Sequence, residues 1–229
     1  MFDLDGYGPL LMQGAKLTIY VGVCAMVIAI GLGLIGVLCK FSRSATVRFC
    51  VNTYTTVVRG VPELVLILLV YYGVPTLVQD LSAALGHPVY LSLDPFISGT
   101  ATIGFIYGAF STEVFRGAYL AVPAGQIEAA RACGMNSALT FRRITLPQMM
   151  RHALPGLGNV WMVLIKATAL ISVIQLPELM RSADIAARNT RKPFTFFFAA
   201  SLIYLAITII SNILQQWAEN RAARGVRRA

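Results

Sequence analysis

The sequence predicts an all-α integral membrane protein with five transmembrane helices, and three observations support that prediction. Hydrophobic residues make up 57% of the 229-residue chain and charged residues only 13%, whereas a soluble domain usually carries about 25% charged residues. The mean hydropathy is +0.69. The apolar residues also arrive in long uncharged blocks, which is typical of a chain that crosses a bilayer repeatedly. An ordinary cytosolic enzyme is excluded, and we expect one membrane domain over residues 1–229.

Five segments are long and apolar enough to be these helices. At about 1.5 Å per residue, the uncharged run Leu17–Cys39 covers the roughly 30 Å hydrocarbon core with a little tilt. All five are expected to be helical because lipid leaves no backbone group unpaired. The fourth is interrupted only by Lys166. The expected spans are residues 17–39, 61–80, 95–115, 153–176 and 194–218.

The distribution of basic residues predicts the orientation. The net charge of +9 indicates membrane topology and contact with anionic headgroups rather than nucleic-acid binding. With the N-terminus outside, thirteen Lys and Arg residues fall in cytoplasmic segments and four fall in the outer loop 177–193. We therefore expect a periplasmic N-terminus and a cytoplasmic C-terminus. The four outer residues, Arg181, Arg188, Arg191 and Lys192, belong either to a solvated loop or to a docking surface for another protein.

The first span carries a stripe of small side chains on one helix face. They recur at steps of three and four residues, which lets another backbone approach closely. This face is expected to pack against another helix, either of the same chain or of a second subunit. Its members are Gly22, Ala25, Ala29, Gly33 and Gly36.

The longest polar segment, the loop of residues 121–150, is expected on the cytoplasmic side. Pro123 can open a helix, and Gly134 suits the left-handed position that ends one. Asn136 or Ser137 can cap a second helix that stops at Pro147. The segment therefore predicts two short helices around a glycine turn. This unit either fits a groove of another protein or lies at the membrane surface without a partner.

The same loop resembles a known family. Glu128-Ala129-Ala130, Gly134 and Ile144-x-Leu146-Pro147 are similar, at every position and spacing, to the signature of the membrane subunits of binding-protein-dependent ABC importers. Three further segments resemble the polar amino acid branch of that family, which includes the histidine/lysine/arginine/ornithine permeases and the opine permeases. These segments are 59–64, 115–118 and 166–170.

The resemblance implies a non-catalytic permease subunit of a bacterial inner-membrane importer for polar, basic amino acids or related opines. It implies that the loop couples the spans to a cytoplasmic ATPase dimer, with ATP and Mg²⁺ bound on that partner and no cofactor in this chain. A second, homologous permease chain and a periplasmic solute-binding protein are the other implied partners, besides the lipid bilayer. The implied coupling residues are Glu128, Ala129, Ala130, Gly134, Ile144, Leu146 and Pro147.

One observation independently supports the expectation that ATP is bound by a partner chain. No lysine here follows a glycine, so the phosphate-binding pattern G-x-x-x-x-G-K-[ST] is absent. The alternative function is an autonomous channel or secondary carrier for a polar solute, although the chain shows no internal repeat. A membrane-bound enzyme fits poorly, because no nucleophile–base pair stands near a span end and the scattered Cys and His residues offer no metal spacing.

Three charged residues within the expected spans are candidates for the substrate path. Lys166 lies near the middle of the fourth span, where an unpaired lysine costs roughly 2.5–3.5 kcal/mol. We expect it to pair with Glu63 or Glu113, or else to meet the α-carboxylate of a solute. Glu63 can alternatively lie at headgroup level. Glu113 stands three residues before Arg116, the spacing of a local ion pair.

Overall fold

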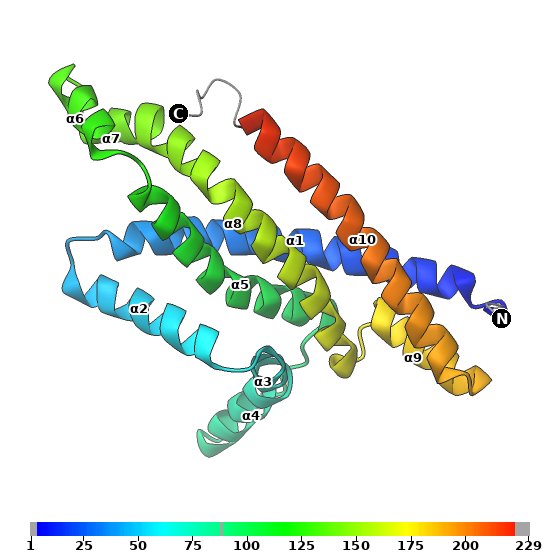
Figure 1. Cartoon of the computed structure of the whole chain (residues 1–229). Coiled ribbons are helices and arrows are strands. Elements are labelled where there is room, and N and C mark those ends of the chain that lie inside the picture. The colour runs from blue at the N-terminus through cyan, green and yellow to red at the C-terminus, as the bar shows by residue number, and fades with distance from the viewer. Residues whose placement is uncertain (1–3, 88, 223–229) are drawn as a thin grey trace.

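The computed structural model describes residues 4–87 and 89–222. Within these ranges the chain is helical and contains no β-strand (Figure 1), so the expected fold class is confirmed. The four longest elements are α1 (Gly8–Lys40), α10 (Pro193–Ala222), α5 (Pro95–Leu120) and α8 (Leu146–Ala167). The main core lies where α1, α5 and α8 meet.

The number of apolar spans differs from the expected five. Among the described residues, four helical segments are long and apolar enough to cross a membrane, and the expected count is corrected accordingly. The segment missing from this set is α5, which has 26 residues but many small polar ones. Ser98, Thr102 and Thr112 are buried against protein, and the two threonine hydroxyls donate to carbonyls one turn earlier. The four segments are Gly8–Lys40, Glu63–Ala84, Ser137–Ile174 and Pro193–Ala222.

The helix expected over 153–176 begins much earlier. Helix α7 (Ser137–Thr140), a π-helical turn (Phe141–Thr145), α8 and a 3₁₀ turn (Thr168–Ile174) form one continuous helical segment. Pro147 therefore does not end a separate short helix. A proline ring clashes with the carbonyl four residues before it, and the wider π turn directly ahead of Pro147 accommodates it.

The small-residue stripe of α1 packs within the chain, and all five of its members are buried. A Cβ atom added to Gly33 would lie 2.6 Å from the Cβ of Ser111 on α5, and one added to Gly22 would lie 2.6 Å from Cδ1 of Ile165 on α8. In the other direction, Gly104 of α5 faces Ile28 of α1. The expected packing face is confirmed, and its partners are α5 and α8 of the same chain.

Two amphipathic helices lie outside the expected spans. Helix α2 (Ala45–Gly60) buries Val51, Thr55 and Val58, and its Tyr54 hydroxyl donates to the carbonyl of Phe105 at 2.6 Å. Helix α9 (Leu179–Thr190) lies in the expected outer loop, where one face packs in a cluster with α1 and α10. The interpretation of that outer segment as a solvated loop is therefore wrong for one face of α9.

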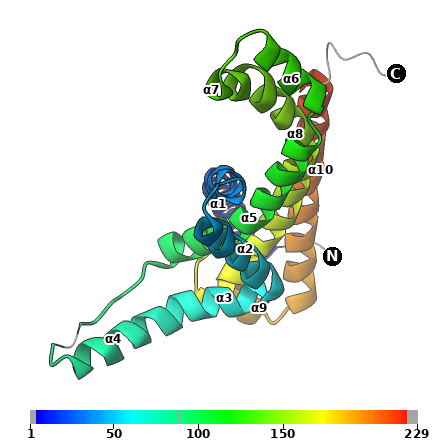
Figure 2. The same ribbon diagram turned by 90° about the vertical axis from the view of Figure 1, so that its left-hand side faces the viewer.

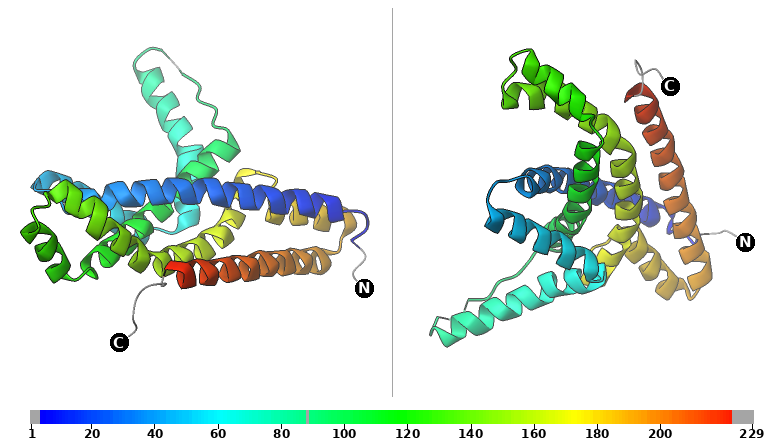
Figure 3. Two further views of the ribbon diagram at one scale, coloured as in Figure 1. Left: turned by 90° about the horizontal axis from the view of Figure 1, so that it is seen from above. Right: turned by 60° about the vertical axis from the view of Figure 1, so that its left-hand side comes forward.

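The second span projects from the rest of the molecule. It consists of α3 (Glu63–Leu68), a π-helical turn (Leu69–Gly73) and α4 (Val74–Ala84). Figures 2 and 3 show it extending away from the other helices, and α4 has no buried residue. Its apolar surface is therefore left for lipid or for another chain.

Candidate functional site

The first feature of the candidate site is the short helix α6 (Ala124–Ala132) and the turn that ends it. Pro123 is its N-cap. At its C-terminus, the N–H of Met135 donates to the carbonyl of Ala130 at 3.1 Å, and the N–H of Gly134 donates to that of Arg131 at 2.9 Å. This is the Schellman arrangement, in which the residue after the C-cap is left-handed. Gly134 has φ +79°, so the expected glycine turn is confirmed.

The chain enters the next helix immediately after this turn. The side chain of Asn136 accepts a hydrogen bond from the N–H of Leu139 at 2.9 Å and caps α7. A Cβ atom at Gly134 would meet nothing within 4 Å. The requirement for glycine is therefore conformational, because the left-handed region costs other L-residues roughly 1–2 kcal/mol.

The seven signature residues divide into an exposed set and a set that contacts protein. Glu128, Ala129, Gly134 and Pro147 are exposed. Ala130 is buried, whereas Ile144 and Leu146 are partly buried. Helix α6 thus exposes one face, which carries Glu128 and Ala129, and packs against the rest of the molecule with the opposite face.

The inner face of this loop is joined to the spans by an apolar cluster. Ile127 of α6 and Leu146 of α8 pack against a buried group that includes Phe115 of α5. The amide of Gln148 also donates a hydrogen bond to the amide oxygen of Gln126. This close-packed cluster connects α6 mechanically to α5 and α8.

Glu113 forms ion pairs near the C-terminal ends of α1 and α5. Its carboxylate accepts from Nζ of Lys40 at 2.5 Å and from Nε of Arg116 at 2.8 Å. The local pair with Arg116 is therefore confirmed, and the bond to Lys40 joins α1 to α5. Both carboxylate oxygens are occupied, which makes Glu113 a structural residue in this arrangement.

Glu63 lies at the start of α3 and contacts α5. The hydroxyl of Tyr107, a buried residue of α5, donates to Oε1 of Glu63 at 2.9 Å. Nearby, the guanidinium of Arg59 lies 5.2 Å from the ring centroid of Phe110, within the range of a cation–π contact. These contacts fasten the base of the projecting second span to α5.

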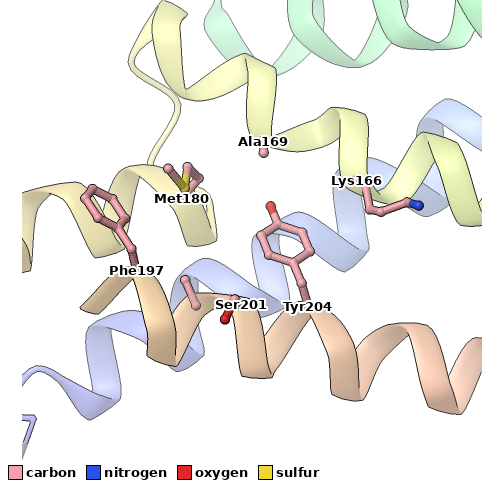
Figure 4. A pocket seen from close by; sticks show the side chains of 7 residues that line it. Lys166, Ala169, Met180, Phe197, Ser201 and Tyr204 are labelled. Carbon is pink, nitrogen blue, oxygen red and sulfur yellow. The ribbon is translucent and has the colours of Figure 1, made fainter. Parts of the chain in front are cut away.

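Lys166 has a different environment from the one expected. No ion pair joins it to an acidic side chain within the described ranges, so the expected pairing with Glu63 or Glu113 is wrong. Each of those carboxylates has nearer partners. Lys166 is exposed and lines a cavity of about 270 Å³ between α8, α9 and α10, together with Met180, Phe197 and Tyr204 (Figure 4). Its charge is thus available to a group from outside the chain.

Sequence reasoning missed Glu178, the N-cap of α9, which is fully buried. Its carboxylate accepts from the N–H groups of Met180 and Arg181 and from the hydroxyls of Thr18 and Tyr204. Burial raises the pKa of Glu178 to about 7, although these hydrogen bonds oppose the shift. The residue ties α9 to α1 and α10. The one signal in the sequence was an acidic residue after Pro177, at the end of an apolar run.

The exposed face of α9 is charged. Asp184 accepts hydrogen bonds from Arg181 at 3.3 Å and from Arg188 at 2.9 Å, so two guanidinium groups share one carboxylate and leave a positive excess. The three residues line a second cavity of about 300 Å³. The helix thereby presents a rigid basic surface, held in place by its buried face.

Comparison with known proteins identifies relatives across nearly the whole chain. Residues 31–224 match the family model described as binding-protein-dependent transport system inner membrane component. The chain is 43% identical to the histidine/lysine/arginine/ornithine transport system permease protein HisQ of Salmonella typhimurium, covering 99% of both chains. It is also 43% identical to the octopine transport system permease protein OccQ of Rhizobium meliloti, covering 99% of this chain and 96% of the relative.

Solved structures show the same fold. A crystal structure of an amino acid ABC transporter with histidines matches with a TM-score of 0.81 at 31% identity, covering 94% of this chain and 95% of that chain. The MetNI methionine ABC transporter in an inward-facing conformation matches with a TM-score of 0.67 at 14% identity, which supports the fold alone.

Proposed function

This chain belongs to the binding-protein-dependent transport system inner membrane components, and on that premise we propose that it imports basic amino acids or opines as one half of a translocation pathway. One of the relatives is named for the transport of histidine, lysine, arginine and ornithine, and another for the transport of octopine. These solutes share an α-carboxylate and a nitrogen-rich, basic side group. The proposed substrate class is therefore a cationic or guanidino amino acid, delivered by a periplasmic solute-binding protein.

The observation that best supports coupling to an ATPase is the geometry of α6. Its Glu128 and Ala129 are exposed, whereas its inner face and the following helix pack on α5 and α8. We assign α6 to a cleft of a cytoplasmic ATPase dimer that binds ATP and Mg²⁺. Closure of that dimer would move α6 and, through the apolar cluster, the spans.

The proposed orientation places the N-terminus in the periplasm and the C-terminus in the cytoplasm. It puts α6 and most basic residues inside, in agreement with the positive-inside rule. We propose that α5 also crosses the bilayer, sheltered from lipid by α1 and α8, because its small polar residues are buried in the bundle. The projecting second span would then contact the second permease chain of the pair.

Lys166 is the residue that we assign to the substrate path. It is a cation in a membrane helix, it is exposed to a cavity, and no described acidic side chain neutralises it. A solute carboxylate would supply the missing negative charge. Glu63 and Glu113, which have protein partners, are assigned to structural roles.

The test is uptake by the complete transporter. This chain, its partner permease, the ATPase and the binding protein are reconstituted in proteoliposomes, and uptake of labelled arginine and histidine is measured with ATP. We expect uptake that requires ATP and binding protein and is abolished by Gly134→Arg while the membrane subunits still assemble. Uptake that persists without ATP and ignores Gly134→Arg would indicate an autonomous carrier. ATP-dependent coupling without uptake of either amino acid would refute only the substrate class.

A further inference from the structure

A long apolar groove runs between α8 and α10 over the surface of α1. It has a volume of about 460 Å³. Its walls come from Met26 and Ile30 of α1, Leu154 and Trp161 of α8, and Leu214 of α10. Gly158 forms its narrow side, since a Cβ atom there would collide with the side chain of Gln215.

Basic residues directly adjoin the groove residues on α8 and α10. Arg151, an exposed residue, directly follows the groove residue Met150 on α8. On α10, the guanidinium of Arg221 lies 5.6 Å from the ring centroid of Trp217, one turn beyond the groove residue Ala218. One acidic residue, Glu219, is also near and accepts a hydrogen bond from Gln215 at 2.7 Å. The residues next to this groove therefore include two exposed arginines and one carboxylate that is already hydrogen-bonded.

We propose that this groove binds an anionic phospholipid, with an acyl chain along α1, α8 and α10 and the headgroup phosphate between Arg151 and Arg221. The two parts of the site match the two parts of such a lipid. The apolar wall suits an acyl chain and offers no charge to a polar solute. The two arginines carry positive charge that an uncharged acyl chain would not neutralise, whereas a phosphate would. Basic pockets between membrane helices at the cytoplasmic side are typical sites for anionic headgroups.

The flanks of the groove support lipid rather than a protein helix as the occupant. The groove residue Leu214 and its neighbour Trp217 are exposed by 61% and 62%, so this part of α10 is open to the surroundings. An apolar partner helix would fill the groove without neutralising Arg151 and Arg221. Only the assignment to the cytoplasmic leaflet depends on the proposed orientation, and the site itself does not depend on the transported solute.

The two tryptophans of the chain make the site testable, because Trp161 lines the groove and Trp217 directly precedes the groove residue Ala218. The assembled transporter carrying Trp217→Phe is reconstituted with a small mole fraction of phosphatidylglycerol or phosphatidylcholine brominated on its acyl chains. Bromine quenches nearby indole fluorescence. A matched complex with Trp161→Phe in addition provides the background of the other subunits, and the difference between the two is the Trp161 signal.

We expect brominated phosphatidylglycerol to quench Trp161 at several-fold lower mole fraction than brominated phosphatidylcholine. Each arginine near a membrane surface favours an anionic lipid by about fivefold, so Arg151→Gln with Arg221→Gln should remove the preference. Arg43→Gln, an exposed arginine away from the groove, should keep it. Equal quenching by both lipids, a preference that survives the double substitution, or no quenching by either lipid would overturn the proposal. The last result is the one expected if a protein helix fills the groove. None of these outcomes requires transport, so they are independent of the proposed solute.

Discussion

Two glycines of α1, Gly31 and Gly33, allow the packing of α1 against α5 to be tested within one turn of helix. A Cβ atom at Gly33 would lie 2.6 Å from Cβ of Ser111, 3.0 Å from its backbone carbon and 3.1 Å from Cδ2 of Phe115. A Cβ atom at Gly31 would meet nothing within 4 Å. Gly33→Ala therefore forces α1 and α5 apart, whereas Gly31→Ala adds a methyl group in open space.

The expected magnitudes follow from these contacts. Because the backbone carbon of Ser111 cannot rotate away, Gly33→Ala should cost the roughly 1–3 kcal/mol typical of overpacking. Gly31→Ala should be neutral or stabilising by about 0.5–1 kcal/mol, because alanine has the higher helix propensity. The assay is thermal unfolding of the purified, detergent-solubilised permease, followed by circular dichroism and by size-exclusion chromatography. Equal midpoints for the two variants would refute the packing of this stripe against α5.

Three further predictions concern charged residues and the glycine turn. The pKa of Glu178 is raised from 4.5 to about 7 in the folded state, so between these pH values folding is accompanied by proton uptake. The free energy of unfolding should therefore be greatest below about pH 4.5, decline by up to about 3 kcal/mol as the pH rises to 7, and then level off. A thermal-midpoint profile against pH measures this, Glu178→Gln should flatten it, and an unchanged slope in that variant would contradict the assignment. Lys166→Met should lower uptake at least tenfold but leave the thermal midpoint unchanged or higher, because no ion pair within the described residues is lost. Lys40→Met leaves Glu113 with one partner and should lower the midpoint. A lower midpoint for Lys166→Met together with an unchanged midpoint for Lys40→Met would argue against these roles. Gly134→Ala should destabilise the turn by about 1–2 kcal/mol and Gly134→Asn by less, since asparagine tolerates the left-handed region; ATPase activity stimulated by the binding protein should fall in that order, and equal activities would exclude a conformational role for Gly134.

The glycine turn was predictable because all of its signals are local. Pro123, Gly134 and Asn136 each specify backbone geometry within a few residues, and the structure places all three as expected. The small-residue stripe of α1 was predictable for the same reason. That α5 and α8 pack against this stripe could not be predicted, because helical spacing identifies a packing face but not the element that covers it.

The remaining differences come from long-range contacts. The five-span expectation was too high because it counted uncharged runs, and α5 is uncharged over much of its length but carries many small polar residues. Helices α2 and α9 were missed because half-buried helices with polar outer faces resemble loops in a search for uniform apolar runs. The expected partners of Lys166 were wrong because Tyr107 and Lys40, distant in sequence, contact Glu63 and Glu113 instead. Likewise, Glu178 meets Thr18 across 160 positions.

The central claim is that the exposed face of α6 contacts an ATPase, and site-specific photocross-linking tests it most directly. A photoreactive amino acid replaces Ala129 on α6 or, as a control, Ala45 on α2, since both alanines are exposed and the proposed orientation puts both on the cytoplasmic side. We predict that position 129 forms an adduct with the ATPase subunit in the assembled transporter and that position 45 does not. Equal yields from both positions, or no adduct from position 129, would contradict the account.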